Sequence, residues 1–104
     1  MNKLPTRVKI GGRTWKVDQK PDEGCNGSVF WREGRIGLQS GLGAYDVRQV
    51  LLHEVLHVLQ DELGHWQGTT RLDREVIADG LAHQLVQVMD ENVSLRKFMW
   101  GGTQ

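Results

Sequence analysis

Apolar and polar residues alternate along the first forty positions, and this pattern predicts β-strands. The segments TRVKI and RTWKV flank Gly11 and Gly12, a pair that tolerates positive φ and suits a two-residue hairpin turn. NGSVFW and RIGLQ are separated by REG, which predicts a second hairpin over about residues 27–39. We therefore expect a small, mostly antiparallel sheet of two hairpins over about residues 5–40.

Beyond Tyr45 the apolar positions follow helical spacing instead. Asp46 is a suitable N-cap for a first helix over about residues 46–63, and Gly64 would end it. Apolar residues cover most of the circumference of this helix: Val47, Leu51, Leu52, Val55, Leu56, Val58 and Leu59. A helix of this kind is expected to be buried.

A second helix is predicted over about residues 71–92, after a polar, glycine-containing connection. Thr70 and Asp73 stand at the spacing of a capping box before it. The tail, residues 93–104, could add a short helical turn from which Phe98 and Trp100 pack back on the protein. These elements predict one α+β domain over residues 1–104, with the sheet packed on two long helices.

The first helix carries the pattern H-E-x-x-H at His53, Glu54 and His57. Residues four apart lie one turn apart on the same face, so both imidazoles can reach one zinc ion. Glu54 lies about 100° around the helix, where it can act as general base toward a water molecule at the metal.

The polar residues of this helix share one sector, which only Val50 interrupts: Gln49, His53, Glu54, His57, Gln60 and Asp61. A core histidine that merely satisfies a hydrogen bond needs no such neighbours. The clustering therefore favours a metal site over a pair of buried, hydrogen-bonded histidines.

A catalytic zinc ion needs a third protein ligand and one open position. Glu75 falls within the apolar arc of the second helix, where a carboxylate is costly unless it is paired or binds a metal. We therefore expect Glu75 to be the third ligand. Asp79, one turn later, is the alternative ligand, or else a partner that orients a ligand histidine.

With H-E-V-L-H at 53–57 and Glu75 in REVIADGLAHQL, the chain resembles small zinc metallopeptidases of the gluzincin type. It is similar in particular to phage-encoded and minimal gluzincin-like proteins, in which a short sheet precedes LLHExxH and an E-x-x-x-[DE]-x-x-A segment follows. The resemblance implies a zincin-like domain that binds one Zn²⁺ per chain through His53, His57 and Glu75. It also implies hydrolysis of peptide bonds, with Glu54 as the general base.

Two further residues compete for the third ligand position. His65 lies eight residues after His57, which leaves little chain for a turn back to the metal. Cys25 lies in DEGCNGS, a setting similar to that of the ligand cysteine in peptide deformylases. A deformylase-like hydrolase that uses Cys25 is therefore an alternative, although the glycine-rich glutamine motif of that family is missing.

Other residues could support the reaction from around the metal. Tyr45, His65 and His83 are candidates for stabilising an oxyanion, and Asp61 lies in the polar sector as a possible partner of a ligand. A peptide or protein substrate could pair with a free sheet edge, which we expect in the strand at about Arg35–Ser40.

The overall charge adds no other partner. Thirteen basic and thirteen acidic residues cancel, so nothing indicates binding to nucleic acid or to a membrane surface. Cys25 is the single cysteine, and we find no signal-peptide or membrane-span pattern. We expect a cytoplasmic protein, in the host cytoplasm if it is phage-encoded, whose oligomeric state the sequence leaves open.

Two non-enzymatic hypotheses use the same zinc site. A phage or prophage protein of this size could bind a protein or peptide without cleaving it. Alternatively, the zinc could only stabilise a small domain, and the site would then be closed by a fourth ligand such as Asp79, His65 or Cys25. Glu54 favours catalysis, because a structural site gains nothing from a base beside the metal.

Overall fold

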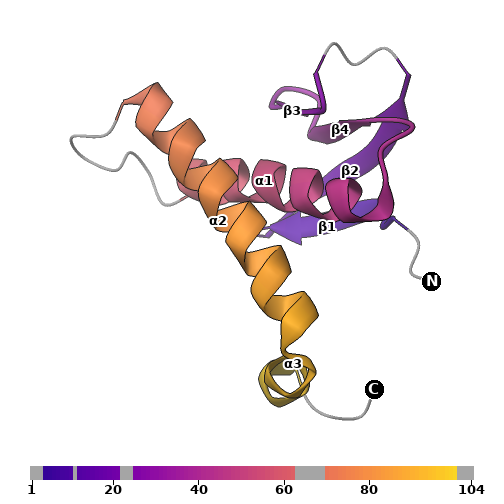
Figure 1. The fold of residues 1–104 in the computed structure, drawn as a ribbon. Coiled ribbons are helices and arrows are strands. Elements are labelled where there is room, and N and C mark those ends of the chain that lie inside the picture. Colours follow the sequence, from indigo (N-terminus) through magenta and orange to yellow (C-terminus); the bar gives the residue numbers. More distant parts are fainter. Residues whose placement is uncertain (1–3, 11, 22–24, 63–69, 101–104) are drawn as a thin grey trace.

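The computed structural model describes residues 4–10, 12–21, 25–62 and 70–100 (Figure 1). Four strands precede three helices in this part of the chain: β1 (Arg7–Ile10), β2 (Arg13–Lys20), β3 (Gly27–Phe30), β4 (Arg35–Gln39), α1 (Ala44–Glu62), α2 (Arg71–Glu91) and α3 (Val93–Trp100). The predicted α+β class is confirmed, with a sheet that precedes the helices in the chain.

Both predicted hairpins are present, because β1 pairs with β2 and β3 pairs with β4 in antiparallel fashion. Gly12 has a φ of 86° between β1 and β2, as expected of a turn glycine, while Gly11 lies outside the described residues. The hairpins meet through a parallel pairing of β2 with β4, so the sheet is mixed and has the order β1-β2-β4-β3.

The prediction of a free sheet edge at Arg35–Ser40 is wrong. β4 lies between β2 and β3 and is hydrogen-bonded to both. Its backbone groups are therefore occupied on both sides, and the edge strands are β1 and β3.

One face of the sheet carries the hydrophobic core. Trp15 and Val17 of β2 and Ile36 and Leu38 of β4 point to this face, where Val58 of α1 packs against them. The alternation of strand side chains sends their neighbours to the other face. There the Arg35 guanidinium binds the Asp18 carboxylate at 2.8 Å.

α1 begins two residues earlier than predicted. The Val47 amide donates a 2.9 Å hydrogen bond to the Gly43 carbonyl, so the helix already continues from Ala44. Asp46 therefore lies in the first turn rather than at the N-cap. In the first turn its negative charge still interacts favourably with the helix dipole. The predicted end at Leu63 and Gly64 lies outside the described residues.

α2 begins with the predicted capping box. The Thr70 hydroxyl accepts from the Asp73 amide at 3.0 Å, and the Asp73 carboxylate accepts from the Thr70 amide at 2.9 Å. α1 lies between the sheet and α2, since α2 contacts α1 but no strand among the described residues (Figure 1). The two helices run antiparallel, as their paired residues show: Arg48 with Asp90, His53 with Asp79 and Gln60 with Arg74.

The predicted tail forms a helix, α3, that contacts only α2 among the described elements (Figure 1). Phe98 is 85% exposed and Trp100 is 66% exposed, so the prediction that they pack back is wrong. The physical reason is the position of α3 beyond the end of α2, where no strand reaches it. In the described part of the chain, no helix has the length and apolar character needed to cross a membrane.

Candidate metal centre

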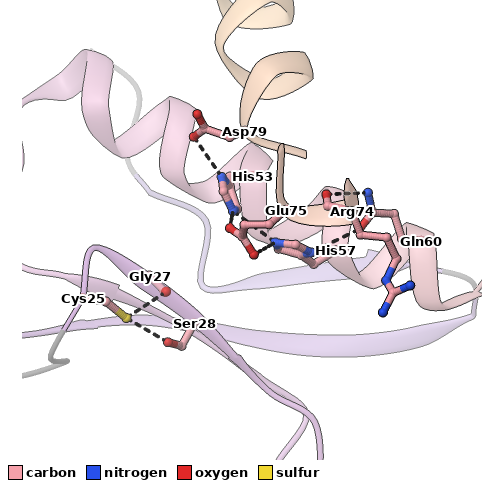
Figure 2. Close-up of polar contacts among 9 residues, drawn as sticks. All are labelled: Cys25, Gly27, Ser28, His53, His57, Gln60, Arg74, Glu75 and Asp79. Carbon is pink, nitrogen blue, oxygen red and sulfur yellow. Dashed lines mark hydrogen bonds and ion pairs between the residues drawn. The ribbon is translucent and has the colours of Figure 1, made fainter. Parts of the chain in front are cut away.

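Three side chains from two helices meet at one point. His53 and His57 project from α1, and Glu75 projects from α2 between them (Figure 2). One Glu75 oxygen lies 2.7 Å from His53 Nε2 and the other lies 3.0 Å from His57 Nε2. The two Nε2 atoms are 3.1 Å apart. Among the described residues, these three form the group of histidine, cysteine and acidic side chains that is close enough to hold a metal ion.

Glu75 reaches α1 because of its place in the packing stripe of α2. The stripe consists of Ala78, Ala82 and Val86, which are the buried residues of this helix. Glu75 lies one turn before Ala78, so it shares the face that packs on α1. Its side chain is 52% exposed, although its position falls within the apolar arc of this helix. The stripe reaches its open end here, and the carboxylate extends into a cavity.

The hydrogen bonds of Gln60 define the proton position on His57. Gln60 is 5% exposed, and its amide nitrogen donates to the Arg74 carbonyl at 3.1 Å. Its amide oxygen therefore faces His57 Nδ1 at 3.1 Å and can only accept. His57 Nδ1 is therefore the nitrogen that donates to Gln60, and Nε2 is the atom that faces Glu75 and could bind a metal.

Asp79 has the same effect on His53. Its carboxylate oxygen lies 3.3 Å from His53 Nδ1, on the opposite side of the ring from Glu75 (Figure 2). A carboxylate beside Nδ1 favours the hydrogen on that nitrogen and leaves Nε2 as the potential ligand atom. Of the two predicted positions for Asp79, this geometry supports the orienting one.

The three converging atoms fit a metal ion. If both rings are neutral with their hydrogens on Nδ1, the two Nε2 lone pairs and the carboxylate repel one another unless a cation lies between them. A proton can bridge two of these atoms, whereas a metal ion can bind all three. Tetrahedral zinc with bonds of about 2.0 Å separates its ligands by about 3.3 Å, close to the separations of 2.7–3.1 Å found here.

Glu54 lies beside this centre and faces the sheet. It is 7% exposed, and burial raises its pKa against the opposing effect of His53 and His57. A Cβ atom on Gly27 would come within 2.7 Å of Val50 Cγ1 and 3.1 Å of a Glu54 carboxylate oxygen. Only glycine therefore allows β3 to approach α1 so closely at Glu54.

The pKa of Glu75 is shifted in the opposite direction from that of Glu54. Partial burial acts to raise the pKa of Glu75, but the positive charge of His57 and the hydrogen bonds from both rings, in their protonated forms, outweigh burial and lower it. The carboxylate is therefore in its ionised form near neutral pH, as a metal ligand must be.

Two cavities adjoin the centre, and His53, Glu54 and Glu75 line both of them. The larger is about 500 Å³, and its other lining residues are Gly27, Ser28, Val29, Trp31, His57, Gln60, Asp61, Arg71 and Arg74. The smaller is about 260 Å³, and its other lining residues are Asn26, Gly27, Asp46, Gln49, Val50 and Asp79. The candidate centre therefore has a cavity on each side into which a substrate could extend.

The structure separates Tyr45 and His83 from the centre. The Tyr45 hydroxyl lies 3.4 Å from His83 Nδ1, so the two side chains pair with each other. Tyr45 precedes His53 by eight residues, which is about 12 Å along a helix. Neither residue lines the two cavities, so their positions do not support the predicted oxyanion role.

The remaining candidates fall in different places. Asp61 lines the larger cavity, as its place in the polar sector indicated. The Cys25 thiol lies 3.1 Å from the Gly27 carbonyl and 3.1 Å from the Ser28 hydroxyl, and it is not part of the metal-binding group (Figure 2). His65 lies outside the described residues.

Four residues at the centre were not predicted to have a role: Gln60, Gly27, Arg71 and Arg74. Gln60 could have been found, because it follows His57 by one turn in the polar sector and can orient that ring. No sequence pattern pointed to Gly27, Arg71 or Arg74, because their approach to the centre depends on how β3 and α2 are placed around α1.

No protein-family model, curated protein or solved structure matches this chain. The hypothesis of a gluzincin-like centre therefore depends on the H-E-x-x-H motif and on the geometry of the centre.

Proposed function

We propose that this protein is a zinc-dependent metallopeptidase of the gluzincin type, which binds one Zn²⁺ through His53, His57 and Glu75. The observation that carries the proposal is the convergence of two Nε2 atoms and one carboxylate, while both Nδ1 atoms face acceptors. We place the activity in the cytoplasm, which the single cysteine supports.

When bound, zinc supplies a Lewis acid that lowers the pKa of water and polarises a carbonyl group. Glu54 then acts as the general base, taking a proton from the attacking water and passing it to the departing amine. Its position supports this role, because it follows His53 directly and lines both cavities. The cavities beside the centre favour a catalytic site over a structural one, because they leave room for water and substrate. The Asp79 carboxylate faces His53 Nδ1, so it is not placed as a fourth ligand.

The β3 edge is the best docking site for a peptide substrate. The Gln39 amide donates to the Asn26 carbonyl at 2.7 Å, so residues 26, 28 and 30 direct their backbone groups toward β4. The backbone groups of Gly27 and Val29 face the open edge, and both residues line the larger cavity. A peptide can therefore add as a further strand beside Glu54.

Glu54→Gln tests the proposal. We expect wild-type protein to hold one zinc per chain by elemental analysis and to cleave peptides from an unbiased fluorogenic library. The variant should keep its zinc and its melting temperature but lose at least about 100-fold in kcat/KM, since the general base is gone. The exposed Glu91→Gln on α2 is the matched control and should cleave as wild type does. A Glu54→Gln protein as active as wild type would refute the peptidase.

A further inference from the structure

The two cavities beside the metal centre differ in charge. Arg71 and Arg74 line the larger cavity, at the His57 end of the centre. Asp46 and Asp79 line the smaller cavity, and no arginine or lysine is among the described residues that surround it. A substrate that crosses the centre therefore meets two arginines on one side and only acidic charges on the other.

The two arginines are held on one face of α2. They are three residues apart in its first turn, so both side chains can face the same cavity. This turn is attached to α1 by the Gln60 amide, which donates to the Arg74 carbonyl. The Arg74 guanidinium projects at the His57 end of the centre, away from Asp79 (Figure 2).

The acidic residues of the larger cavity do not cancel this charge. Its lining includes Glu54, Asp61 and Glu75. Glu75 belongs to the candidate metal centre, and Glu54 is 7% exposed and lies against Gly27 of β3. Outside the candidate centre, Asp61 is therefore the exposed acidic residue that lines this cavity together with the two arginines.

We propose that the larger cavity is a subsite for a carboxylate of the peptide substrate, bound by Arg71 and Arg74. This inference rests on the proposed peptidase function and specifies its substrate class. Guanidinium groups bind carboxylates through paired N–H donors, which gives both affinity and orientation. Trp31, at the end of the β3–β4 hairpin, is 43% exposed and offers an apolar wall for the stem of a glutamate side chain.

The carboxylate has two possible sources, an acidic side chain within the peptide or its free carboxyl terminus. Three labelled peptides of one sequence distinguish them. The first has glutamine at the varied position and an amidated end, the second has glutamate there and an amidated end, and the third keeps glutamine but has a free carboxyl terminus.

Binding is measured by fluorescence anisotropy on zinc-loaded Glu54→Gln protein, and cleavage is measured on zinc-loaded wild type. We expect the glutamate peptide, the free-terminus peptide or both to bind about tenfold more tightly than the neutral peptide. This preference should shrink as salt is added. Arg71→Gln and Arg74→Gln, each in the Glu54→Gln background, should remove it and leave the affinity for the neutral peptide unchanged. Arg96→Gln, on exposed α3, is the matched control and should keep the preference.

The outcomes separate this inference from the peptidase proposal. Equal binding and cleavage of all three peptides would overturn the carboxylate subsite and leave the peptidase standing. Tight binding of a carboxylate peptide that wild type never cleaves would support the subsite and overturn the peptidase. A preference that persists in both arginine variants, with melting temperatures unchanged, would also overturn the subsite.

Discussion

The two sides of α1 are packed in different ways. Toward the sheet, its contacts belong to an apolar core that contains the largest fully buried side chains: Trp15, Ile36, Leu38 and Val58. Toward α2, the buried residues of the partner helix are only Ala78, Ala82 and Val86. The first interface removes large apolar surfaces from water, and the second removes small ones.

Several polar pairs also join α2 to α1. Arg48 binds Asp90 through two hydrogen bonds of 2.6 and 3.0 Å, and Gln60 binds the Arg74 carbonyl. The metal centre lies in the same interface. Apolar burial therefore holds the sheet to α1, whereas the contacts that would bind zinc also help to dock α2.

Metal removal should give the largest difference between the two sides. If free zinc stands about 1,000-fold above its Kd, binding adds about 4 kcal/mol of stability to the folded state. Chelation should therefore lower the hydrogen-exchange protection of α2 amides much more than that of β2 and β4 amides. His57→Ala, which removes a proposed zinc ligand, should show no response to chelator. Equal loss of protection in β4 and α2 would contradict the distinction.

Leu38→Ala tests the apolar side. Leu38 is fully buried between sheet and helix, so its truncation should lower the free energy of unfolding by about 2–5 kcal/mol. Urea unfolding of the metal-free protein measures this loss. Leu72→Ala on α2, where the residue is 71% exposed, is the matched control and should change stability by less than about 0.5 kcal/mol. Similar losses of stability in the two variants would show that the burial of Leu38 against α1 does not stabilise the protein.

Gln60→Leu tests the polar side at the metal centre. The variant keeps the size of the side chain but leaves His57 Nδ1 and the Arg74 carbonyl without their amide partner. Loss of such an orienting contact should weaken zinc binding by about 10–100-fold. Competition with a coloured chelator measures the affinity. Gln84→Leu, on the exposed face of α2, should bind zinc as wild type does. Unchanged affinity in Gln60→Leu would show that the contact does not orient the ring.

The smallest effect is expected on the solvent face of the sheet. The hydrogen bond from Arg35 holds the pKa of Asp18 below its ordinary value of 3.8. The resulting stability is present above that ordinary value and is lost as pH falls through the lowered pKa, and we expect no more than about 1 kcal/mol from it. Urea unfolding of Asp18→Asn should show a shallower loss of stability between pH 5 and 3 than wild type. An identical slope would remove Asp18 as a source of the acid sensitivity.

Local patterns predicted the elements well because their causes are local. The capping box of Thr70 and Asp73 depends on two residues three apart, and it is present as predicted. Both hairpins follow from alternation and turn glycines. The start of α1 differed because a helix boundary also depends on backbone geometry, and the Gly43 carbonyl accepts the hydrogen bond that extends the helix.

Long-range placement was beyond these patterns. The parallel pairing of β2 with β4 puts β4 in the middle of the sheet, and alternation within a strand carries no information about its neighbours. The exposure of Phe98 and Trp100 likewise depends on how far α3 lies from the sheet.

By itself, the sequence determined that His53 and His57 lie one turn apart on the same helix face, with Glu54 beside them. Helical geometry fixes the relative positions of residues one and four apart. It also indicated Glu75, because a carboxylate within an apolar arc needs a partner. Only the tertiary structure decided which atoms meet. The antiparallel docking of α2 brings Glu75 to both Nε2 atoms, places Asp79 beside Nδ1 of His53, and lines the neighbouring cavity with two arginines. These contacts join residues about twenty positions apart, and only the packing of whole helices sets such distances.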